Sequence, residues 1–306
     1  MTSQPPSLKS EPIRESELII NPDGSIYHLH LQPEQIADTI ITVGDPDRVD
    51  MVSQYFDRIE HKVQKREFIT HTGYIGRKRV SVISTGIGTD NIDICFNELD
   101  ALANIDFATR QIRPELRQLN FIRIGTSGCL QADTPLDSFL ASSFGIGMEG
   151  LMLYYDYKNT DDAEALQNAL NAYAAQTGIN FPLPISASQA SGELLQLLAG
   201  EGSSIHTGIT ITATGFYAPQ NRQLRVASRL GNTLEKLSGF SFQGQAVTNF
   251  EMETSAIYGL ATALGHRALS LNALIANRPR GVFSADPYAA VDKLIQYTLA
   301  KIENLD

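Results

Sequence analysis

Two glycine-containing segments, each joined to a run of apolar, β-branched residues, carry arginines suited to binding an anion. The first is GDPDR at 44–48, after the run at 39–43, and the second is RIGTSG at 123–128, at the end of the run at 120–124. A strand-to-helix turn aims backbone N–H groups at an anion, and an arginine closes on a phosphate as a planar fork. Either segment alone also fits an ordinary turn with a solvated arginine. Because such turns converge at the carboxyl edge of an α/β sheet, the pair predicts an anion site there.

Two further segments carry side chains suited to a flat heterocycle and a polar ligand. In FYAPQNR at 216–222 the aromatic residues can stack on a ring, while Gln220 and Arg222 pair with its carbonyl and N–H groups. Glu251 and Glu253 would diverge if both lay on a helix, so we expect one of them to face the site. Both segments also fit plainer interpretations, a loop that caps the core and carboxylates that complement a helix dipole.

The patterns of several other catalytic sites are missing from the sequence. It contains no nucleophile elbow, no Walker lysine and no dinucleotide fingerprint. His28 and His30 could share one face of an extended stretch, but two histidines without a third ligand make a poor zinc site. We therefore predict neither a metal nor an organic cofactor.

Composition limits the partners and the compartment. The chain has 306 residues, 42% of them hydrophobic, and 24 Lys+Arg against 34 Asp+Glu give a net charge of −10. An acidic chain without a long basic run argues against nucleic acid or an anionic membrane as its main partner. Cys95 and Cys129 show no CxxC spacing, which favours a reducing, cytoplasmic compartment. Neither a signal peptide nor an apolar stretch of the roughly 20 residues that span a bilayer is visible.

The elements that would position these residues alternate along the chain. Buried strands are expected at 39–43, 79–84, 120–124, 138–142, 208–214 and 269–276. Helices are expected at 46–56, 161–176, 222–238, 253–265 and 287–303, and around the apolar stripe of Ile92, Cys95, Phe96 and Leu99. This alternation predicts one α/β domain over residues 21–306 with a largely parallel sheet, preceded by a flexible polar arm over residues 1–20.

Taken in chain order, these motifs resemble the nucleoside phosphorylase superfamily, with the uridine phosphorylase branch nearest. The matching segments are YHL at 27–29, GDPDR at 44–48, REF at 66–68, STGIG at 84–88, RIGTSG at 123–128, FYAPQNR at 216–222, NFEMETS at 249–255 and NR at 277–278. The resemblance covers residues 27–303 in colinear order. It implies a single α/β domain whose mixed, largely parallel sheet has a distorted barrel shape and is flanked by helices.

The resemblance also implies roles for individual residues. The phosphate site it implies consists of Gly44, Arg48, Arg123 and Thr126, with Arg66 supplied by the neighbouring subunit. The ribose site it implies consists of Met252 and Glu253, with His28 supplied by the neighbouring subunit. The base site it implies consists of Phe216, Gln220, Arg222 and Arg278. The catalytic residues among these are Arg123, Gln220, Arg222 and Glu253.

The activity implied is reversible phosphorolysis of a pyrimidine nucleoside, in which uridine and phosphate give uracil and ribose 1-phosphate. Phosphate is then a co-substrate, and no cofactor is implied. Purine-specific relatives carry an aspartate acid where this chain has Asn277, and an amide cannot act as a general acid. Since His28 and Arg66 would serve a neighbouring site, a homodimer is the smallest assembly expected, and a hexamer stays open.

Three alternatives remain at this point. A purine nucleoside phosphorylase or a nucleosidase that uses water would keep the fold, and a non-catalytic nucleoside-binding protein would keep the pocket. Arg48, Arg66 and Arg123 argue against the nucleosidase, because water needs no phosphate clamp. The family's monovalent cation site lies near Glu67 and Ile87, but Asn91 replaces its serine, so no ion is predicted.

Overall fold

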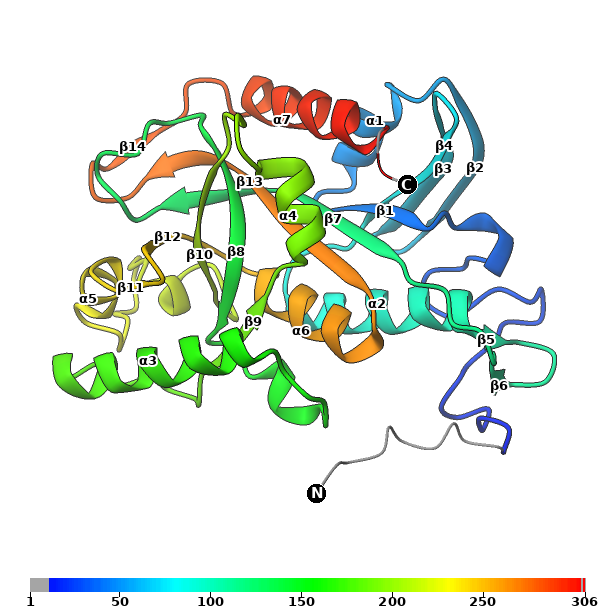
Figure 1. Cartoon of the computed structure of the whole chain (residues 1–306), viewed down its shortest axis with the longest axis horizontal. Helices are drawn as coiled ribbons and strands as arrows, with labels where there is room; N and C mark the ends of the chain where they lie inside the picture. The colour runs from blue at the N-terminus through cyan, green and yellow to red at the C-terminus, as the bar shows by residue number, and fades with distance from the viewer. Residues whose placement is uncertain (1–10, 304, 306) are drawn as a thin grey trace.

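A single large sheet forms the scaffold of the computed structural model, which describes residues 11–303 and 305 (Figure 1). Its twelve strands are β1 (Thr39–Val43), β2 (Arg58–Lys65), β3 (Phe68–Ile75), β4 (Lys78–Ser84), β7 (Asn120–Cys129), β8 (Phe139–Gly147), β9 (Ser186–Gln189), β10 (His206–Thr212), β11 (Ser241–Phe242), β12 (Gln245–Glu251), β13 (Arg267–Asn277) and β14 (Val282–Phe283). A separate small hairpin joins β5 (Ile105–Asp106) to β6 (Gln111–Ile112).

The order of the strands closes part of the sheet into a barrel. The order is β11-β12-β10-β8-β13-β7-β1-β4-β3-β2, and a further pairing of β12 with β7 closes the ring of β12, β10, β8, β13 and β7. The pairings β12–β10, β10–β8, β13–β7, β7–β1 and β1–β4 are parallel, whereas β8–β13, β4–β3, β3–β2 and β12–β7 are antiparallel. The prediction of a single α/β domain with a mixed, barrel-like sheet is therefore confirmed.

Helices cover both sides of this sheet. They are α1 (Asp47–Ser53), α2 (Thr89–Asn104), α3 (Asp161–Thr177), α4 (Gly192–Ala199), α5 (Thr233–Ser238), α6 (Thr254–Leu264) and α7 (Pro287–Ile302), with 3-10 turns η1 (Pro33–Gln35), η2 (Leu151–Tyr154) and η3 (Ala218–Gln220). In Figure 1, α2, α3 and α6 lie below the sheet and α7 lies above it. The stripe predicted on α2 is confirmed, since Ile92, Cys95, Phe96 and Leu99 are all buried. Within the described residues, no helix has the length and apolarity needed to cross a bilayer.

The segment RIGTSG at 123–128 is a strand and not the turn predicted. It lies inside β7, which continues to Cys129. The strand does not stop after Ile124 because β13 pairs with it in parallel as far as Cys129, and β12 pairs with Gly128 and Cys129 from the other edge. In the first segment, Pro46 precedes the helix as its N-cap instead of occupying the first helical position.

One predicted helix is shorter than expected and one hairpin was not predicted, and both differences arise from which residues are buried. The helix predicted at 222–238 forms only over α5, because Leu224 and Val226 are exposed and Gly231 has a φ of +54°. A helix without a buried apolar face gains too little from packing to form. The β2–β3 hairpin was not predicted, since β2 is polar and largely exposed at the edge of the sheet.

Part of the predicted N-terminal arm packs against the domain. Ile13 donates its backbone N–H to Arg110 O at 2.8 Å, and the Arg110 side chain donates to the carbonyls of Ile13, Arg14 and Leu18. The Leu18 side chain is buried, at 6% exposed. From residue 11 onward the chain is thus attached to the domain, in contrast to the free arm predicted over residues 1–20, and residues 1–10 lie outside the described residues.

Candidate active site

A cavity of about 730 Å³ lies beyond the carboxyl ends of β1, β4, β10 and β12, the edge at which the sequence places an anion site. The residues of the predicted site that line it are Gly44, Arg48, Arg123, Thr126, Phe216, Gln220, Arg222, Met252 and Glu253. The residues of the predicted site that do not line it are His28, Arg66 and Arg278. The structure therefore brings together in one cavity residues that lie far apart in the sequence.

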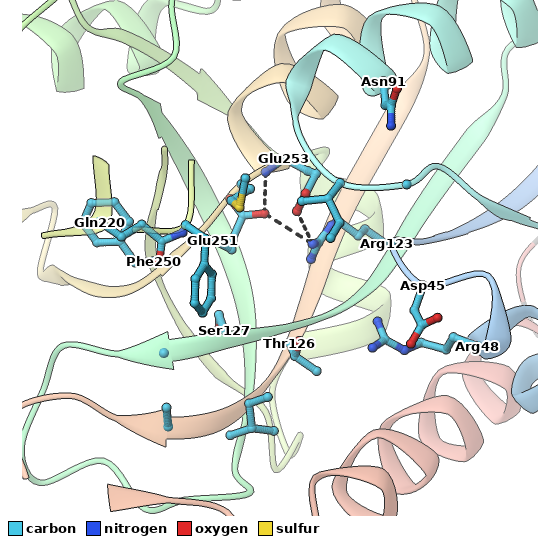
Figure 2. Close-up of a pocket in the computed structure, with 18 of the residues that line it drawn as sticks. Asp45, Arg48, Asn91, Arg123, Thr126, Ser127, Gln220, Phe250, Glu251 and Glu253 are labelled. Atoms are coloured by element: carbon cyan, nitrogen blue, oxygen red, sulfur yellow. Dashed lines mark hydrogen bonds and ion pairs between the residues drawn. The ribbon is translucent and has the colours of Figure 1, made fainter. Parts of the chain in front are cut away.

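The side chains in the cavity are arranged from one end to the other by chemical type. In Figure 2, Asp45 and Arg48 lie on one side, Gln220 and Phe250 lie on the other, and Arg123 lies between them with Glu251 and Glu253. One end thus presents the Arg48 guanidinium beside Asp45, the middle presents the Arg123 guanidinium between two carboxylates, and the far end presents an amide beside aromatic rings. A ligand with an anionic, a hydroxylated and a planar part would match this order.

Arg123 is the central cation of the cavity. Its side chain is buried and its Nη2 contacts Glu253 Oε2, while Glu251 Oε2 lies 3.6 Å from the same nitrogen. Its Nη1 donates to Asn272 Oδ1 at 3.3 Å. Burial alone would lower the pKa of Arg123, but Glu253 and Glu251 outweigh burial and raise it. Arg123 therefore remains a cation, and its guanidinium is held by Glu253 and by Asn272.

Both carboxylates face Arg123, so the prediction that only one would face the site is wrong. Glu251 is the last residue of β12, and Glu253 is the N-cap of α6, so the two do not diverge around a helix. Glu251 accepts hydrogen bonds from Thr212 Oγ1 at 2.7 Å and from the backbone N–H groups of Glu253 and Thr254 at 2.9 and 3.0 Å. Burial raises the pKa of Glu251, although Arg123 opposes this shift.

Glu253 connects a further loop to the same cluster. Its Oε1 accepts the backbone N–H of Gly88 at 2.8 Å, which fixes the STGIG segment at 84–88 against the start of α6. Asn272 is the residue of this cluster that sequence reasoning missed, whereas Glu251 was considered only as an alternative to Glu253. Asn272 has no local signal that could have revealed its role, because it meets Arg123 only through the pairing of distant strands.

Gly125 makes room for the Arg123 guanidinium. The two residues lie two apart on β7 and share a face of the strand, and the Arg123 side chain folds back along it. A Cβ atom at position 125 would lie 1.6 Å from Arg123 Nη1, far inside any permitted contact. Position 125 therefore requires glycine because of where the Arg123 guanidinium lies, and not because of a special backbone conformation.

Arg48 brings a second guanidinium to the cavity, on the side where Asp45 lies. Its Nη1 donates to Ile124 O at 3.3 Å, which joins the segment at 44–48 to β7 as predicted from the convergence of strand ends. Burial, followed by the positive charge of Arg123, lowers the pKa of Arg48, and Asp45 opposes this effect. Arg48 thus offers a guanidinium to an anion bound at this end of the cavity.

Gln220, Arg222 and Phe216 form one unit at the opposite end. Arg222 Nη1 donates to Gln220 Oε1 and to Phe216 O, and the guanidinium carbon lies 3.8 Å from the centre of the Phe216 ring. Since both hydrogens of Nη1 are used, Nε and Nη2 are the groups of Arg222 left for a ligand. The Gln220 side chain is 2% exposed, so the ligand's contact with it would be shielded from water.

Asn277 is the last residue of β13 and Arg278 follows it, but the two residues differ in their surroundings. Arg278 packs beside Gly128, and its Nη1 is buried without a hydrogen-bond partner among the described residues. Asn277 Nδ2 donates to the carbonyls of Gln131, Ala132 and Thr134. Asn277 is not among the residues that line the cavity. Its amide therefore holds the loop after β7 and offers no acid to a ligand.

His28 and Arg66 lie near each other on a surface outside the cavity. The Arg66 guanidinium carbon is 5.9 Å from the centre of the Tyr27 ring, and the Tyr27 ring meets the His28 ring edge-on with centroids 4.7 Å apart. Arg66 forms the tight turn between β2 and β3, with a φ of +56°. These two residues, which the resemblance assigns to a neighbouring subunit's site, thus occur on one face of this chain.

The chain belongs to the phosphorylase superfamily, which matches residues 38–299. Its relatives include the uridine phosphorylases of Thermococcus kodakarensis, at 27% identity over 85% of this chain and 80% of the relative, and of Escherichia coli, at 26% identity over 83% and 87%. A purine nucleoside phosphorylase of Bacillus subtilis is 26% identical over 80% of this chain and 84% of the relative. The predicted membership of this family is therefore confirmed, and the family is one of enzymes.

A solved structure is similar over nearly the whole chain. The crystal structure of a Trypanosoma brucei nucleoside phosphorylase, described as showing uridine phosphorylase activity, has a TM-score of 0.82 at 30% identity and covers 94% of this chain and 99% of its own. A purine nucleoside phosphorylase from Toxoplasma gondii, with a TM-score of 0.61 at 20% identity, shares the fold. Proteins described as a purine nucleoside phosphorylase and as a nucleoside phosphorylase with uridine phosphorylase activity thus share this fold.

Proposed function

We propose that this protein catalyses reversible phosphorolysis of pyrimidine nucleosides, converting uridine and phosphate into uracil and ribose 1-phosphate. The observation that carries the proposal is the order of groups in one cavity, with Arg48 at one end, Arg123 and its two carboxylates in the middle, and Gln220, which pairs with Arg222, at the other end. That spatial order matches the order of the phosphate, the ribose and the base in the bound reactants. Uracil release that requires phosphate would test it directly.

In this mechanism, phosphate is held by Gly44, Arg48, Arg123 and Thr126 and attacks the anomeric carbon of the nucleoside. The glycosidic C–N bond breaks and its electron pair moves onto the departing base, while the sugar gains oxocarbenium character. Arg222 and Gln220 stabilise the negative charge on the base carbonyls, where it develops. Glu253 accepts hydrogen bonds from the sugar hydroxyls, and Met252 lies beside it along the cavity wall. No covalent intermediate with the protein is required.

Preference for a pyrimidine rests on the base end of the cavity. A uracil anion needs donors near its carbonyl groups, which the free N–H groups of Arg222 and the Gln220 amide supply. A purine leaves more readily when a general acid protonates its imidazole ring, and the Asn277 amide cannot act as that acid. Phe216 and Arg278 complete the base site in the proposal, with Arg278 acting from behind Gly128.

The alternatives are disfavoured by the charges at the phosphate end. A nucleosidase would have no use for Arg48 and Arg123, two buried or partly buried cations that converge on the cavity. A binding protein without activity would not need Glu253 fixed by both Gly88 and Arg123. We include in the proposal a cytoplasmic location, in keeping with the free cysteines Cys95 and Cys129.

We further propose that the active assembly is at least a homodimer, in which Arg66 and His28 of one chain complete the cavity of the other. Their common surface around Tyr27 and their absence from the cavity of their own chain support this arrangement. A two-fold axis would let each chain supply Arg66 and His28 to the cavity of its partner and receive the same two residues in its own cavity.

Complementation between inactive chains tests this assembly. A chain with His28→Ala and Arg66→Ala should be nearly inactive, as should a chain with Glu253→Ala. Mixed dimers of the two contain one intact site, so random mixing should restore about a quarter of the wild-type rate. Activity of the mixture is measured after co-expression with two purification tags.

The matched control mixes Glu253→Ala with Arg222→Ala. Both of these changes lie in the cavity itself, so a mixed dimer has one defect in each cavity and no intact site. We expect no recovery in this control. Equal recovery in both mixtures, or full activity of a monomer, would contradict the proposed exchange of residues.

A further inference from the structure

We infer that Glu98 is a positioning residue that orients His28 toward the ribose of the partner's site, an inference that rests on the function proposed above. The His28 side chain has one ring nitrogen, Nδ1, 2.6 Å from Glu98 Oε1. Glu98 belongs to α2, seventy residues further along the chain, so the contact is made by the fold and not by local sequence. The side chains of His28 and Glu98 are 27% and 14% exposed.

The Glu98 carboxylate holds the backbone of this segment as well as the ring. It accepts the N–H of His28 at 3.0 Å and the N–H of Leu29 at 2.9 Å, in addition to the imidazole contact. Leu29 is buried at 1% exposed, so the backbone beside the histidine is anchored to the core. One carboxylate therefore fixes both the position of the His28 backbone and the rotation of its ring.

This contact determines which ring nitrogen is free and what it can do. A carboxylate that accepts backbone N–H groups acts as an acceptor toward the ring too, so Nδ1 carries the proton. In the neutral imidazole, Nε2 is then the unprotonated nitrogen, and the hydrogen bond made by the other ring atom sets that tautomer. A ribose hydroxyl of the partner's substrate would donate its hydrogen to Nε2.

The surroundings of His28 place it outside the cavity of its own chain, near the other residue proposed to reach the partner. His28 does not line the cavity of its own subunit, and it lies against Tyr27, beside Arg66. Arg66 is the other residue proposed to cross to the partner. A second carboxylate–histidine contact on α2, between Asp100 and His266 Nε2 at 3.1 Å, has its histidine side chain fully buried. The Asp100–His266 pair can only be structural, and it therefore serves as a comparison.

The test uses phosphorolysis of uridine and of its 2′-, 3′- and 5′-deoxy analogues by the full-length oligomer. Glu98→Ala should lower kcat/KM for uridine about tenfold, the effect of losing one hydrogen bond. For the one analogue that lacks the hydroxyl bound by His28, wild type and Glu98→Ala should agree within about threefold. Glu98→Gln should restore activity with uridine in part, since an amide oxygen in the place of Oε1 still accepts from Nδ1 and the His28 N–H, whereas the NH2 group cannot accept from Leu29. The double variant His28→Ala/Glu98→Ala should be no slower than His28→Ala.

Asp100→Ala is the matched control, and it should reduce thermal stability without discriminating among the four substrates. Equal loss by Glu98→Ala on all four substrates, or multiplicative losses in the double variant, would overturn the inference. Nitrogen-15 NMR of the His28 ring gives a readout independent of turnover: the Nδ1–H tautomer should dominate in wild type and lose that dominance in Glu98→Ala. If wild type released no uracil at all, the proposed function would fail, whereas an unchanged tautomer in Glu98→Ala would refute the positioning role itself.

Discussion

Replacing Arg123 with methionine is expected to lower kcat/KM for phosphorolysis by about 10³-fold, since an aligned cation at the charged reactant is lost from a buried site. Methionine fills much of the same volume without a charge. Because Arg123 also orients Glu253, the loss should appear in kcat as well as in the KM for phosphate. Steady-state kinetics with varied phosphate and uridine measure both effects.

The same change should also destabilise the fold in a manner that depends on pH. Removing one partner of a buried ion pair typically costs about 3–5 kcal/mol, and here Glu251 and Glu253 both lose their cation. Burial already raises the pKa of Glu251 above its unfolded value, and loss of Arg123 would raise it further. The folded variant then binds a proton that the unfolded chain has released, so its stability deficit shrinks as pH falls. Chemical denaturation at pH 8 and pH 5.5 measures this difference.

Arg267→Met is the control for Arg123→Met. Arg267 pairs with Glu193 at 2.8 Å, and the Glu193 side chain is 70% exposed, so the pair lies at the surface and away from the cavity. We expect this variant to keep wild-type kinetics and to lose less than about 1 kcal/mol of stability. Comparable loss of activity in both arginine variants would contradict the role of Arg123.

Gly125→Ala is expected to reduce activity by about 10²-fold although it removes no functional group. The new Cβ would lie 1.6 Å from Arg123 Nη1, so the guanidinium must leave its position between Glu253 and Asn272. A displacement of about 1 Å in a catalytic group costs about that factor. Overpacking should add about 1–3 kcal/mol of destabilisation. Kinetics and thermal unfolding of the purified variant measure the two effects separately.

Gly192→Ala provides the matched control for this substitution. A Cβ at Gly192 would meet no atom within 4 Å, and α4 lies outside the cavity lining. Activity should therefore be unchanged. The double variant Arg123→Met/Gly125→Ala should be no less active than Arg123→Met alone, because both changes act through one guanidinium. Additive losses would mean that Gly125 acts by some route other than Arg123.

Much of the fold could be predicted because the residues buried in its central strands are the ones that form apolar runs in the sequence. The strands β1, β4, β7 and β13 each contain the apolar run predicted for them, and β8 and β10 overlap the runs predicted at 138–142 and 208–214. The prediction failed where tertiary pairing overrides local composition. The glycine-rich part of β7 looks like a turn, yet β12 and β13 extend it as a strand.

In the candidate site, too, some residues could be predicted from the sequence and others could not. Arg48, Gln220 and Arg222 stand out in the sequence because each follows a buried strand, and Arg123 stands out because it interrupts an apolar run. All four line the cavity. The partners that hold them do not stand out. Glu251 is one of many carboxylates near a helix start, and Glu98 lies in an ordinary amphipathic helix. Only the folded chain reveals that these carboxylates meet Arg123 and His28.

The measurement that tests the central claim most directly is chromatographic release of uracil from uridine, with and without phosphate, and with inosine in parallel. We expect uracil and ribose 1-phosphate to form together, only when phosphate is present, and no hypoxanthine to appear from inosine. Release without phosphate would indicate a nucleosidase, and preference for inosine would contradict the assignment of the base end formed by Gln220 and Arg222. Binding of uridine without turnover would contradict the proposal that the protein is a phosphorylase.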